Sequence, residues 1–468
     1  ALNGHVTMPA REPLSGADNA WRRMGRTDNL MTITGILWFD RQVGYDELCE
    51  RLASRLLRFD RFKQKVGGRK RRLRVPYWET VENFDIESHV YDISLPEPAD
   101  DETFQRFVGR LMSRPLDERR PLWEAYLVED VDAGPGNAMA IRINHSIGDG
   151  FALLYVLLGL VDDPAGIEFP IGNMPPPPGA DGTAASVAAG ARKHRADSGS
   201  SPDEGPDLGG MRFGKLGAAF GGLRGACDLA TMSDEPDTSL RGELGQAKRA
   251  GWTDEIDLDL IKQIKREHDA TVNDVLLAVT AGAFRRVLAG RGEDTDGLEL
   301  RCTAPVNLKP MAKRGEGLGN GFGLAFLPLP VGTRDLDERI RTIRDRTGIR
   351  KIGIEAYLMY SLLRIGGHVP ESLQELVMAF FEERSTAIVT NVPGPMDTIE
   401  LAGAEVTDLV FWVPQAIDQG IGISLLTYDG SVRVGIAADA NLVPDTAELS
   451  TAFEREVEAL EAELSADR

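Results

Sequence analysis

The segment IRINHSIGDG, residues 141–150, joins an apolar stretch to a loop that contains a histidine, an aspartate and glycines. The residues just before the histidine, AMAIRIN (138–144), predict a β-strand. His145 follows, three residues separate it from Asp149, and Gly150 leads into the apolar segment FALLYVLLGL. A side chain placed where a strand ends and a glycine-containing loop begins often reaches a cleft.

The residues of this loop leave two roles open for His145 and disfavour a third. A packed core histidine is the simplest interpretation. A metal pair with Asp149 is disfavoured, because Ser146, Gly148 and Gly150 interrupt a helix and no third ligand is near. A general base is the other open interpretation, since imidazole titrates near neutral pH. In that case Asp149 would hold the loop, ion-paired with an arginine, and the glycines would leave open space beside the ring.

Length and composition favour a large, non-secreted globular protein. The 468 residues are enough for two or three domains, and 42% of them are hydrophobic. No apolar run reaches the ~18 residues that span a bilayer, and the first residues lack a signal-peptide pattern. The three cysteines, Cys49, Cys227 and Cys302, fit no zinc or disulfide spacing. We therefore expect a reducing, cytoplasmic setting.

The formal net charge of −20 disfavours nucleic-acid binding, which requires a basic surface. Only 11 of the 53 basic residues are lysine. An acidic, lysine-poor surface stays hydrated in concentrated salt, which suggests a salt-loving source. A GC-rich genome would produce the same bias, and stability measured against potassium chloride concentration separates the two explanations.

The order of expected elements predicts an α/β fold in two halves. Residues 1–170 and 246–468 alternate strands with amphipathic helices, whereas 171–245 is rich in proline, glycine and serine and is expected to be a linker or crossover. Expected strands lie at 35–39, 125–131, 138–144, 298–308, 322–330, 386–392, 408–414, 422–430 and 431–439, and expected helices at 45–57, 258–268, 272–289 and 446–466.

Two basic segments could contact anionic groups. Residues 61–74, RFKQKVGGRKRRLR, could bind CoA or anionic lipid or form an exposed basic hairpin. Residues 208–227 place apolar side chains at helical spacing beside Arg212, Lys215 and Arg224. This element could lie on a lipid surface, although we favour packing against the protein because its glycines weaken a helix.

The pattern His-x-x-x-Asp-Gly after a strand resembles the acyl-CoA-dependent acyltransferase superfamily, which includes chloramphenicol acetyltransferase and peptide-synthetase condensation domains. The closer resemblance is to the bacterial wax ester synthase/acyl-CoA:diacylglycerol acyltransferase family. The matching blocks follow in order at 13–40, 83–90, 114–130, 271–279, 302–308, 318–330, 390–395 and 427–445, and they include a Pro-Leu-Trp motif (Pro121, Leu122, Trp123) and an Asn-Asp motif (Asn273, Asp274).

The resemblance implies an α+β sandwich of two chloramphenicol-acetyltransferase-like subdomains with an active-site channel between them. It implies transfer of a long-chain acyl group from acyl-CoA to a fatty alcohol, diacylglycerol or both, giving storage lipids. His145 would be the general base, with no acyl-enzyme, no metal and no cofactor apart from acyl-CoA as co-substrate. The protein would sit peripherally on the cytoplasmic membrane face or on lipid inclusions.

Other residues of the matched motifs receive weaker assignments, and substrate-binding residues stay unassigned. Asn144 stands where the family usually has a first histidine, and its amide can still donate and accept hydrogen bonds. Asn273 is expected either to position a polar group near the reaction or to cap the helix beginning near Asp274. Pro121–Trp123 is expected to shape packing or the channel wall, and His89 to be structural. NVPGP (391–395) predicts a rigid turn in which Gly394 permits positive φ.

Three alternatives remain open. The same fold could use a different alcohol or an amine as acceptor. Because Asn144 replaces a histidine, the chain could be an inactive lipid-binding relative, although the retained His145, Asp149 and Gly150 argue against this. A carrier-protein-dependent condensation domain is the third alternative.

Overall fold

The segment before His145 forms strand β7 near the middle of a six-stranded sheet. This computed structural model describes residues 11–68, 76–129, 131, 135–164, 167, 207–208, 211–212, 232–308, 318–347, 349–369, 384–415 and 418–466. The sheet has the strand order β15 (Glu400–Leu401), β16 (Ala404–Trp412), β2 (Thr32–Phe39), β7 (Ala138–Asn144), β6 (Trp123–Glu129) and β5 (Val90–Ser94). Adjacent strands of this sheet run antiparallel, except β5 and β6, which are parallel.

Alternation along β7 gives the first sheet two apolar faces. Met139, Ile141 and Ile143 belong to the core that also holds buried residues of α2 (Tyr45–Arg55) and α4 (Gly150–Leu160). Ala138 and Ala140 belong to the opposite core, which holds residues of α3 (Asp101–Met112). The His145 loop, which we define as residues 144–150, connects the end of β7 to the start of α4.

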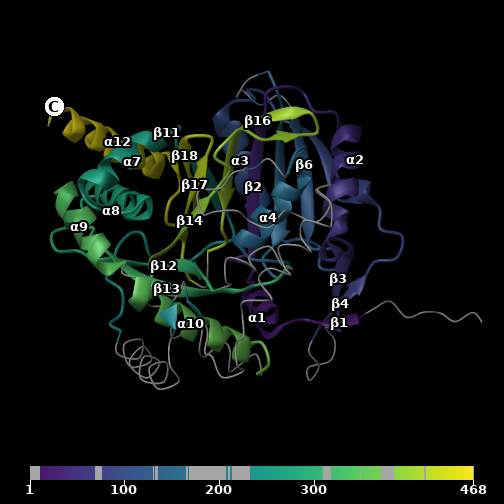
Figure 1. The fold of residues 1–468 in the computed structure, drawn as a ribbon, viewed down its shortest axis with the longest axis horizontal. Coiled ribbons are helices and arrows are strands. Elements are labelled where there is room, and N and C mark those ends of the chain that lie inside the picture. The colour runs from purple at the N-terminus through teal and green to yellow at the C-terminus, as the bar shows by residue number, and fades with distance from the viewer. Residues whose placement is uncertain are drawn as a thin grey trace, which may run out of the picture.

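A second, seven-stranded sheet forms most of the C-terminal half. Its order is β10 (Lys248–Trp252), β18 (Ser431–Asp439), β17 (Ile421–Tyr428), β14 (Ala387–Pro393), β12 (Leu300–Asn307) and β13 (Phe322–Leu329), with β11 (Ile256–Asp257) also paired to β18. The helices of this half are α7 (Leu258–Glu267), α8 (Val272–Gly290), α9 (Leu336–Arg346), α10 (Ile349–Gly366) and α12 (Ala447–Ala466). Figure 1 shows α7, α8, α9 and α12 gathered on the side of this sheet that faces away from the first half.

One strand from the C-terminal half of the sequence belongs to the first sheet. Although β16 follows β14 in the chain, it pairs antiparallel with β2 of the first sheet, with Leu409 opposite Leu37 and Phe411 opposite Gly35. The mixed α/β class and the two sheet-based halves agree with the sequence prediction. The domain boundaries at residues 170 and 245 stay a prediction, and the sequence did not indicate the exchanged strand.

The expected strands and helices are confirmed with shifts at their ends. The remaining elements are β1 (Arg11–Pro13), α1 (Gly16–Met24), β3 (Gln64–Gly67), β4 (Tyr77–Thr80), the short 3-10 helices Leu56–Arg58, Asp60–Lys63 and Ile86–Ser88, and the two-residue strands β8 (Asp207–Leu208) and β9 (Met211–Arg212). No helix among the described residues is both long enough and apolar enough to cross a membrane.

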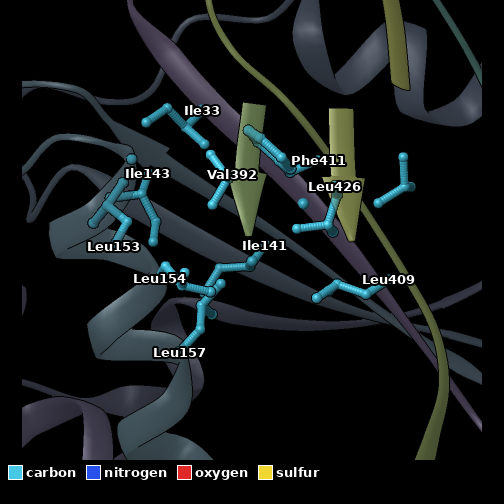
Figure 2. Close-up of a pocket in the computed structure, with 13 residues that line it drawn as sticks. Ile33, Ile141, Ile143, Leu153, Leu154, Leu157, Val392, Leu409, Phe411 and Leu426 are labelled. Carbon is cyan, nitrogen blue, oxygen red and sulfur yellow. The ribbon is translucent and has the colours of Figure 1, made fainter. Parts of the chain in front are cut away.

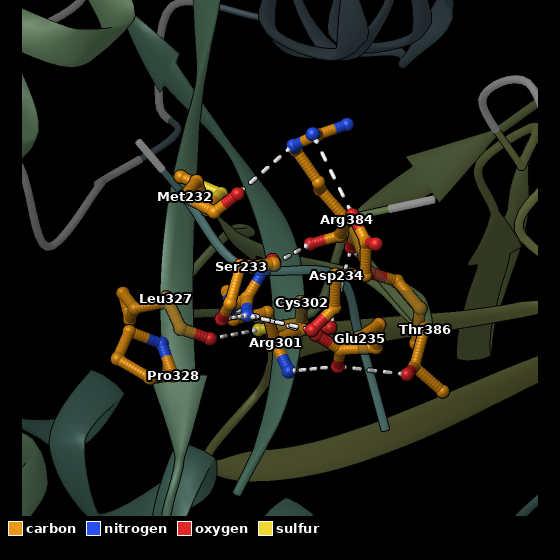
Figure 3. Close-up of polar contacts among 12 residues, drawn as sticks. Met232, Ser233, Asp234, Glu235, Arg301, Cys302, Leu327, Pro328, Arg384 and Thr386 are labelled. Atoms are coloured by element: carbon orange, nitrogen blue, oxygen red, sulfur yellow. Dashed lines mark hydrogen bonds and ion pairs between the residues drawn. The ribbon is translucent and has the colours of Figure 1, made fainter. Parts of the chain in front are cut away.

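The end of the crossover is fixed to the second sheet by a polar cluster. Figure 3 shows Glu235 beside Arg301 of β12 and Thr386. The Glu235 carboxylate accepts hydrogen bonds from the Arg301 amide and from the Thr386 hydroxyl, the latter at 2.9 Å. Burial raises the pKa of Glu235. Most of 171–231, including nearly all of the expected amphipathic element at 208–227, lies outside the described residues.

Candidate active site

The His145 loop is held by hydrogen bonds at each of its turns. The His145 amide donates to the Met31 carbonyl at 2.8 Å. The Asn144 side-chain oxygen accepts from the Ser146 amide at 3.0 Å, which closes an Asx turn. Asp149 is the N-cap of α4, and its Oδ1 accepts from the Ala152 amide at 2.9 Å. Asn144 therefore has a structural function that does not require the family's usual histidine.

The second half of the protein holds the loop from the opposite side. The Oδ2 of Asp149 accepts from the Gly321 amide at 2.8 Å. The Asn320 side-chain amide donates to the His145 carbonyl at 2.9 Å and to Asp18 Oδ1 at 2.8 Å. The contacts described for Asp149 are thus with backbone amides, and the expected arginine partner stays a prediction. Asp18 and Asn320 were not singled out from the sequence, although both lie in matched blocks.

The His145 side chain is buried between aromatic rings. Only 6% of the residue is exposed. Its ring stacks on Trp21 of α1 at a centroid distance of 4.8 Å and lies 5.3 Å from Phe322 of β13. Burial lowers the pKa of His145, and the Asp149 carboxylate partly opposes this shift. The imidazole is therefore neutral around neutral pH, as proton acceptance requires.

His89 provides a comparison within the same chain. It too is buried and stacked on a tryptophan, Trp123, at 4.9 Å, and burial lowers its pKa. Its Nδ1, however, lies 2.8 Å from the Trp123 carbonyl oxygen, as in a satisfied core histidine. His145 Nδ1 is buried with no hydrogen-bond partner among the described residues. The packed-core interpretation therefore fits His89, whereas His145 keeps a ring nitrogen without such a partner.

An apolar pocket has Gly150, the last residue of the His145 loop, in its lining. It has about 540 Å³ of empty space, including its open mouth. Figure 2 shows leucines of α4 facing the inner side of the first sheet across this space. The pocket is lined by Ile33, Gly35, Ile141, Ile143, Gly150, Leu153, Leu154, Leu157, Val392, Leu409, Val410, Phe411 and Leu426. A Cβ placed on Gly150 would meet no atom within 4 Å, and open space beside the His145 imidazole stays a prediction.

The Asn-Asp motif lies at the start of α8. Thr271 is the N-cap, and its capping box with Asp274 shows that the cap interpretation of Asn273 was wrong. The Asn273 side-chain oxygen instead accepts from Asn391 at 3.3 Å. Asp274 also accepts from the Thr347 hydroxyl at 2.6 Å. None of these contacts includes the His145 loop, so a role for Asn273 near the reacting centre stays a prediction.

The Pro-Leu-Trp motif supports the end of β7. Trp123 is fully buried and donates from its ring nitrogen to the Phe62 carbonyl at 2.9 Å. The Leu122 carbonyl accepts from the Asn144 amide at 2.9 Å. The packing role expected for Pro121–Trp123 agrees with this burial, and the motif also anchors the first residue of the His145 loop.

In the turn NVPGP, the prediction for Gly394 was wrong. Gly394 does not take the expected positive φ; a Cβ there would meet the Thr427 carbonyl oxygen at 2.3 Å, so close approach of two backbones requires the glycine.

In the basic segment 61–74, β3 and β4 pair antiparallel, and Arg61 forms an ion pair with Glu12 at 2.6 Å. Residues 69–75 lie outside the described part of the chain, so contact with CoA or lipid stays a prediction.

Comparison with solved structures identifies the fold. The chain is similar to the wax ester synthase/diacylglycerol acyltransferase from Marinobacter aquaeolei VT8, with a TM-score of 0.61, 21% identity, and coverage of 97% of this chain and 99% of that one. It is also similar to the first condensation domain of the calcium-dependent antibiotic synthetase, with a TM-score of 0.60, 15% identity, and coverage of 96% and 95%. These similarities show that the chain has the fold shared by that acyltransferase and by condensation domains.

Comparison of sequences identifies the family. Residues 14–276 match the wax ester synthase/diacylglycerol acyltransferase catalytic domain, and residues 318–461 match the C-terminal domain of the same enzymes. The probable diacylglycerol O-acyltransferase tgs1 of Mycobacterium tuberculosis H37Rv is 28% identical over 416 residues, which cover 88% of this chain and 87% of that protein. The chain belongs to the wax ester synthase/diacylglycerol acyltransferase family and is an acyltransferase.

Proposed function

We propose that this protein transfers a long-chain acyl group from acyl-CoA to a fatty alcohol, to diacylglycerol or to both, forming wax esters, triacylglycerol or both. The observation that carries this proposal is the buried imidazole of His145, whose Nδ1 has no hydrogen-bond partner among the described residues. Membership in the family supports the type of substrate.

In this mechanism His145 is the general base. Its neutral imidazole takes the hydroxyl proton while the alcohol oxygen attacks the thioester carbonyl carbon. The tetrahedral oxyanion then collapses, the carbon–sulfur bond breaks, and the CoA thiolate receives the proton from the imidazolium. The acyl group never bonds to the protein, and His145 returns to its neutral form.

Asp149 and Asn144 are positioning residues in this proposal. Asp149 fixes the loop to α4 and to Gly321, and its charge acts on the pKa of His145. Asn144 closes the Asx turn that leads from β7 into the His145 loop. Both roles explain why the residues after the strand are polar in an otherwise apolar core.

The apolar pocket supports a substrate with an alkyl chain. Its described lining is hydrocarbon apart from backbone atoms, and it includes Gly150, the residue after the N-cap Asp149. Burying each methylene of a chain in such a pocket contributes about 0.8 kcal/mol. A small polar acceptor or acyl group would gain none of this contribution.

Purified protein should be incubated with palmitoyl-CoA and either hexadecanol or dioleoylglycerol, while free CoA thiol and neutral lipid are measured. We expect ester to accumulate in step with thiol, and no label to remain on the protein after radioactive palmitoyl-CoA is added without acceptor. Transfer only to small polar alcohols or amines would reject the lipid acceptors. Acyl label on the protein would reject direct transfer.

We also propose that the protein works at a lipid surface on the cytoplasmic membrane face or on lipid inclusions. The proposed acceptors and products partition into lipid, and α10 carries the exposed apolar residues Tyr357, Leu362 and Ile365. Flotation with vesicles of phosphatidylcholine and phosphatidylglycerol tests this. We expect the protein to float with the vesicles, and its recovery in the bottom fraction at all lipid concentrations would reject surface binding.

A further inference from the structure

Strand β2 has a glycine at its centre where packing alone would favour a large side chain. All eight residues of Thr32–Phe39 are buried. A glycine inside a strand weakens it, because it has no side chain to pack and loses more backbone entropy. Such a glycine usually marks a bulge, a special backbone conformation or the close approach of another group.

Close approach of the protein explains two other buried strand glycines but does not explain Gly35. A Cβ on Gly323 would lie 1.7 Å from the Ala356 carbonyl oxygen, and a Cβ on Gly435 would lie 2.4 Å from the Phe411 carbonyl oxygen. A Cβ on Gly35 would meet only ordinary contacts, at 3.7 Å or more. Its φ is not positive, so neither sterics nor backbone conformation requires glycine here.

The missing side chain of Gly35 leaves room in the apolar pocket. Across the sheet, Gly35 lies in register with Ile141 on β7 and Phe411 on β16, and all three line the pocket. The adjacent row toward the His145 loop contains Ile33 and Ile143. A side chain at position 35 would therefore project into the pocket between large apolar neighbours.

We propose that Gly35 is a specificity-determining residue whose missing side chain sets how far a substrate alkyl chain enters this pocket. The proposal rests on the proposed function and specifies where the chain of its substrate lies. The substrate alkyl chain enters beside Gly150, runs along α4 past Leu153 toward Leu157, and crosses over Gly35. From Gly150 to Leu157 the helix axis advances about 10 Å.

The position of Gly35 gives the point along a substrate alkyl chain at which a larger side chain would block it. Residues two apart on a strand are separated by about 6.6 Å, and an extended chain advances about 1.2 Å per bond. The chain thus reaches Gly35 about five or six carbons beyond the row of Ile33 and Ile143. Loss of two buried methylenes corresponds to roughly a tenfold change in binding.

The alkyl chain could belong to the acyl-CoA or to the alcohol, and the test separates these sources. The variants are Gly35→Ala, Gly35→Val and Gly35→Leu. The control is Gly290→Val, at the exposed end of α8, where an added Cβ would meet no atom within 4 Å. One arm varies acyl-CoA from butyryl to stearoyl with hexadecanol. The other varies alcohol length with palmitoyl-CoA.

Because a leucine side chain brings four carbons into the pocket, we expect one of the two profiles to shift toward shorter chains by about four carbons in Gly35→Leu, less in Gly35→Ala, and not in Gly290→Val. The profile that shifts identifies the source of the chain. Melting temperatures are measured for every variant, and Gly35→Ala, whose Cβ meets only ordinary contacts, supplies the graded result if the leucine variant does not fold.

Binding of the fluorescent fatty acid cis-parinaric acid provides a readout without turnover. We expect Gly35→Leu to weaken its binding at least about tenfold. Folded Gly35 variants with unchanged length profiles and unchanged parinaric acid binding would overturn the proposal. Wild-type protein that forms no ester would instead reject the proposed function, and the binding arm would still decide whether Gly35 limits the pocket.

Discussion

Replacement of Asp149 tests how the two halves of the protein position the His145 loop. One carboxylate oxygen caps α4 at Ala152, and the other accepts the Gly321 amide from the second half. Asp149→Ala removes the cap, which costs about 1 kcal/mol. It also leaves the buried Gly321 amide without an acceptor, which costs about 1–3 kcal/mol. We therefore expect a loss of about 2–4 kcal/mol in the free energy of unfolding, measured in urea.

Asp149→Asn separates the charge from the cap. Its side-chain oxygen can still accept from Ala152, whereas its NH₂ group faces the Gly321 amide, donor against donor. The Asp149 charge holds up the pKa of His145, so its removal lowers that pKa further. We expect the acid limb of kcat/KM to move to lower pH, and kcat to fall by about tenfold or more because the loop is displaced.

Asp335→Ala is the matched control for these variants. Asp335 caps α9 through the Glu338 amide at 2.8 Å on the exposed side of the second half. Its loss should cost about 1 kcal/mol and leave the pH profile unchanged. If folded Asp149→Asn retains the wild-type acid limb, or shifts it to higher pH, the proposed coupling between Asp149 and His145 is refuted.

Three further outcomes are expected. In the wild-type protein the acid limb of kcat/KM should lie below the ordinary histidine value of about 6.5, because burial lowers the pKa of His145; a pH–rate profile measures it, and a limb above that value would count against a buried base. Asn144→Ala should lower kcat/KM in the ester assay through loss of the Asx turn to Ser146, whereas an unchanged rate would remove Asn144 from the positioning residues. Thr271→Ala should cost about 1 kcal/mol in urea without changing the acyl-chain preference, since its capping box serves only α8, and an altered preference would show that α8 acts on the site.

The local part of the site could be predicted from the sequence. The strand before His145 and the glycine-containing loop were predicted from residues 138–150, whereas the segment after them was noted as apolar without being assigned to a helix. The capping box at Thr271 was also readable, since Thr-x-x-Asp precedes an apolar run, but the asparagine between them was considered as the cap instead.

The contacts between halves could not be predicted in the same way. Asp18 and Asn320 are 302 positions apart and meet beside the His145 carbonyl. Periodicity and capping signals act over a few residues and contain no information about such pairs. For the same reason the sequence placed β16 with the second half, whereas it pairs with β2. The matched sequence blocks of the family included Asp18 and Asn320, but the order of the blocks does not show that these residues are in contact.

Substitution of His145 tests the central claim most directly. Ester formation from palmitoyl-CoA and hexadecanol or dioleoylglycerol is measured for wild type, His145→Ala and His268→Ala, the last removing a histidine from the end of α7. Circular dichroism establishes that each variant is folded. We expect His145→Ala to lose about a hundredfold to ten-thousandfold in kcat, and His268→Ala to retain the wild-type rate. Ester formation at the wild-type rate by folded His145→Ala would contradict the assignment of His145 as the base.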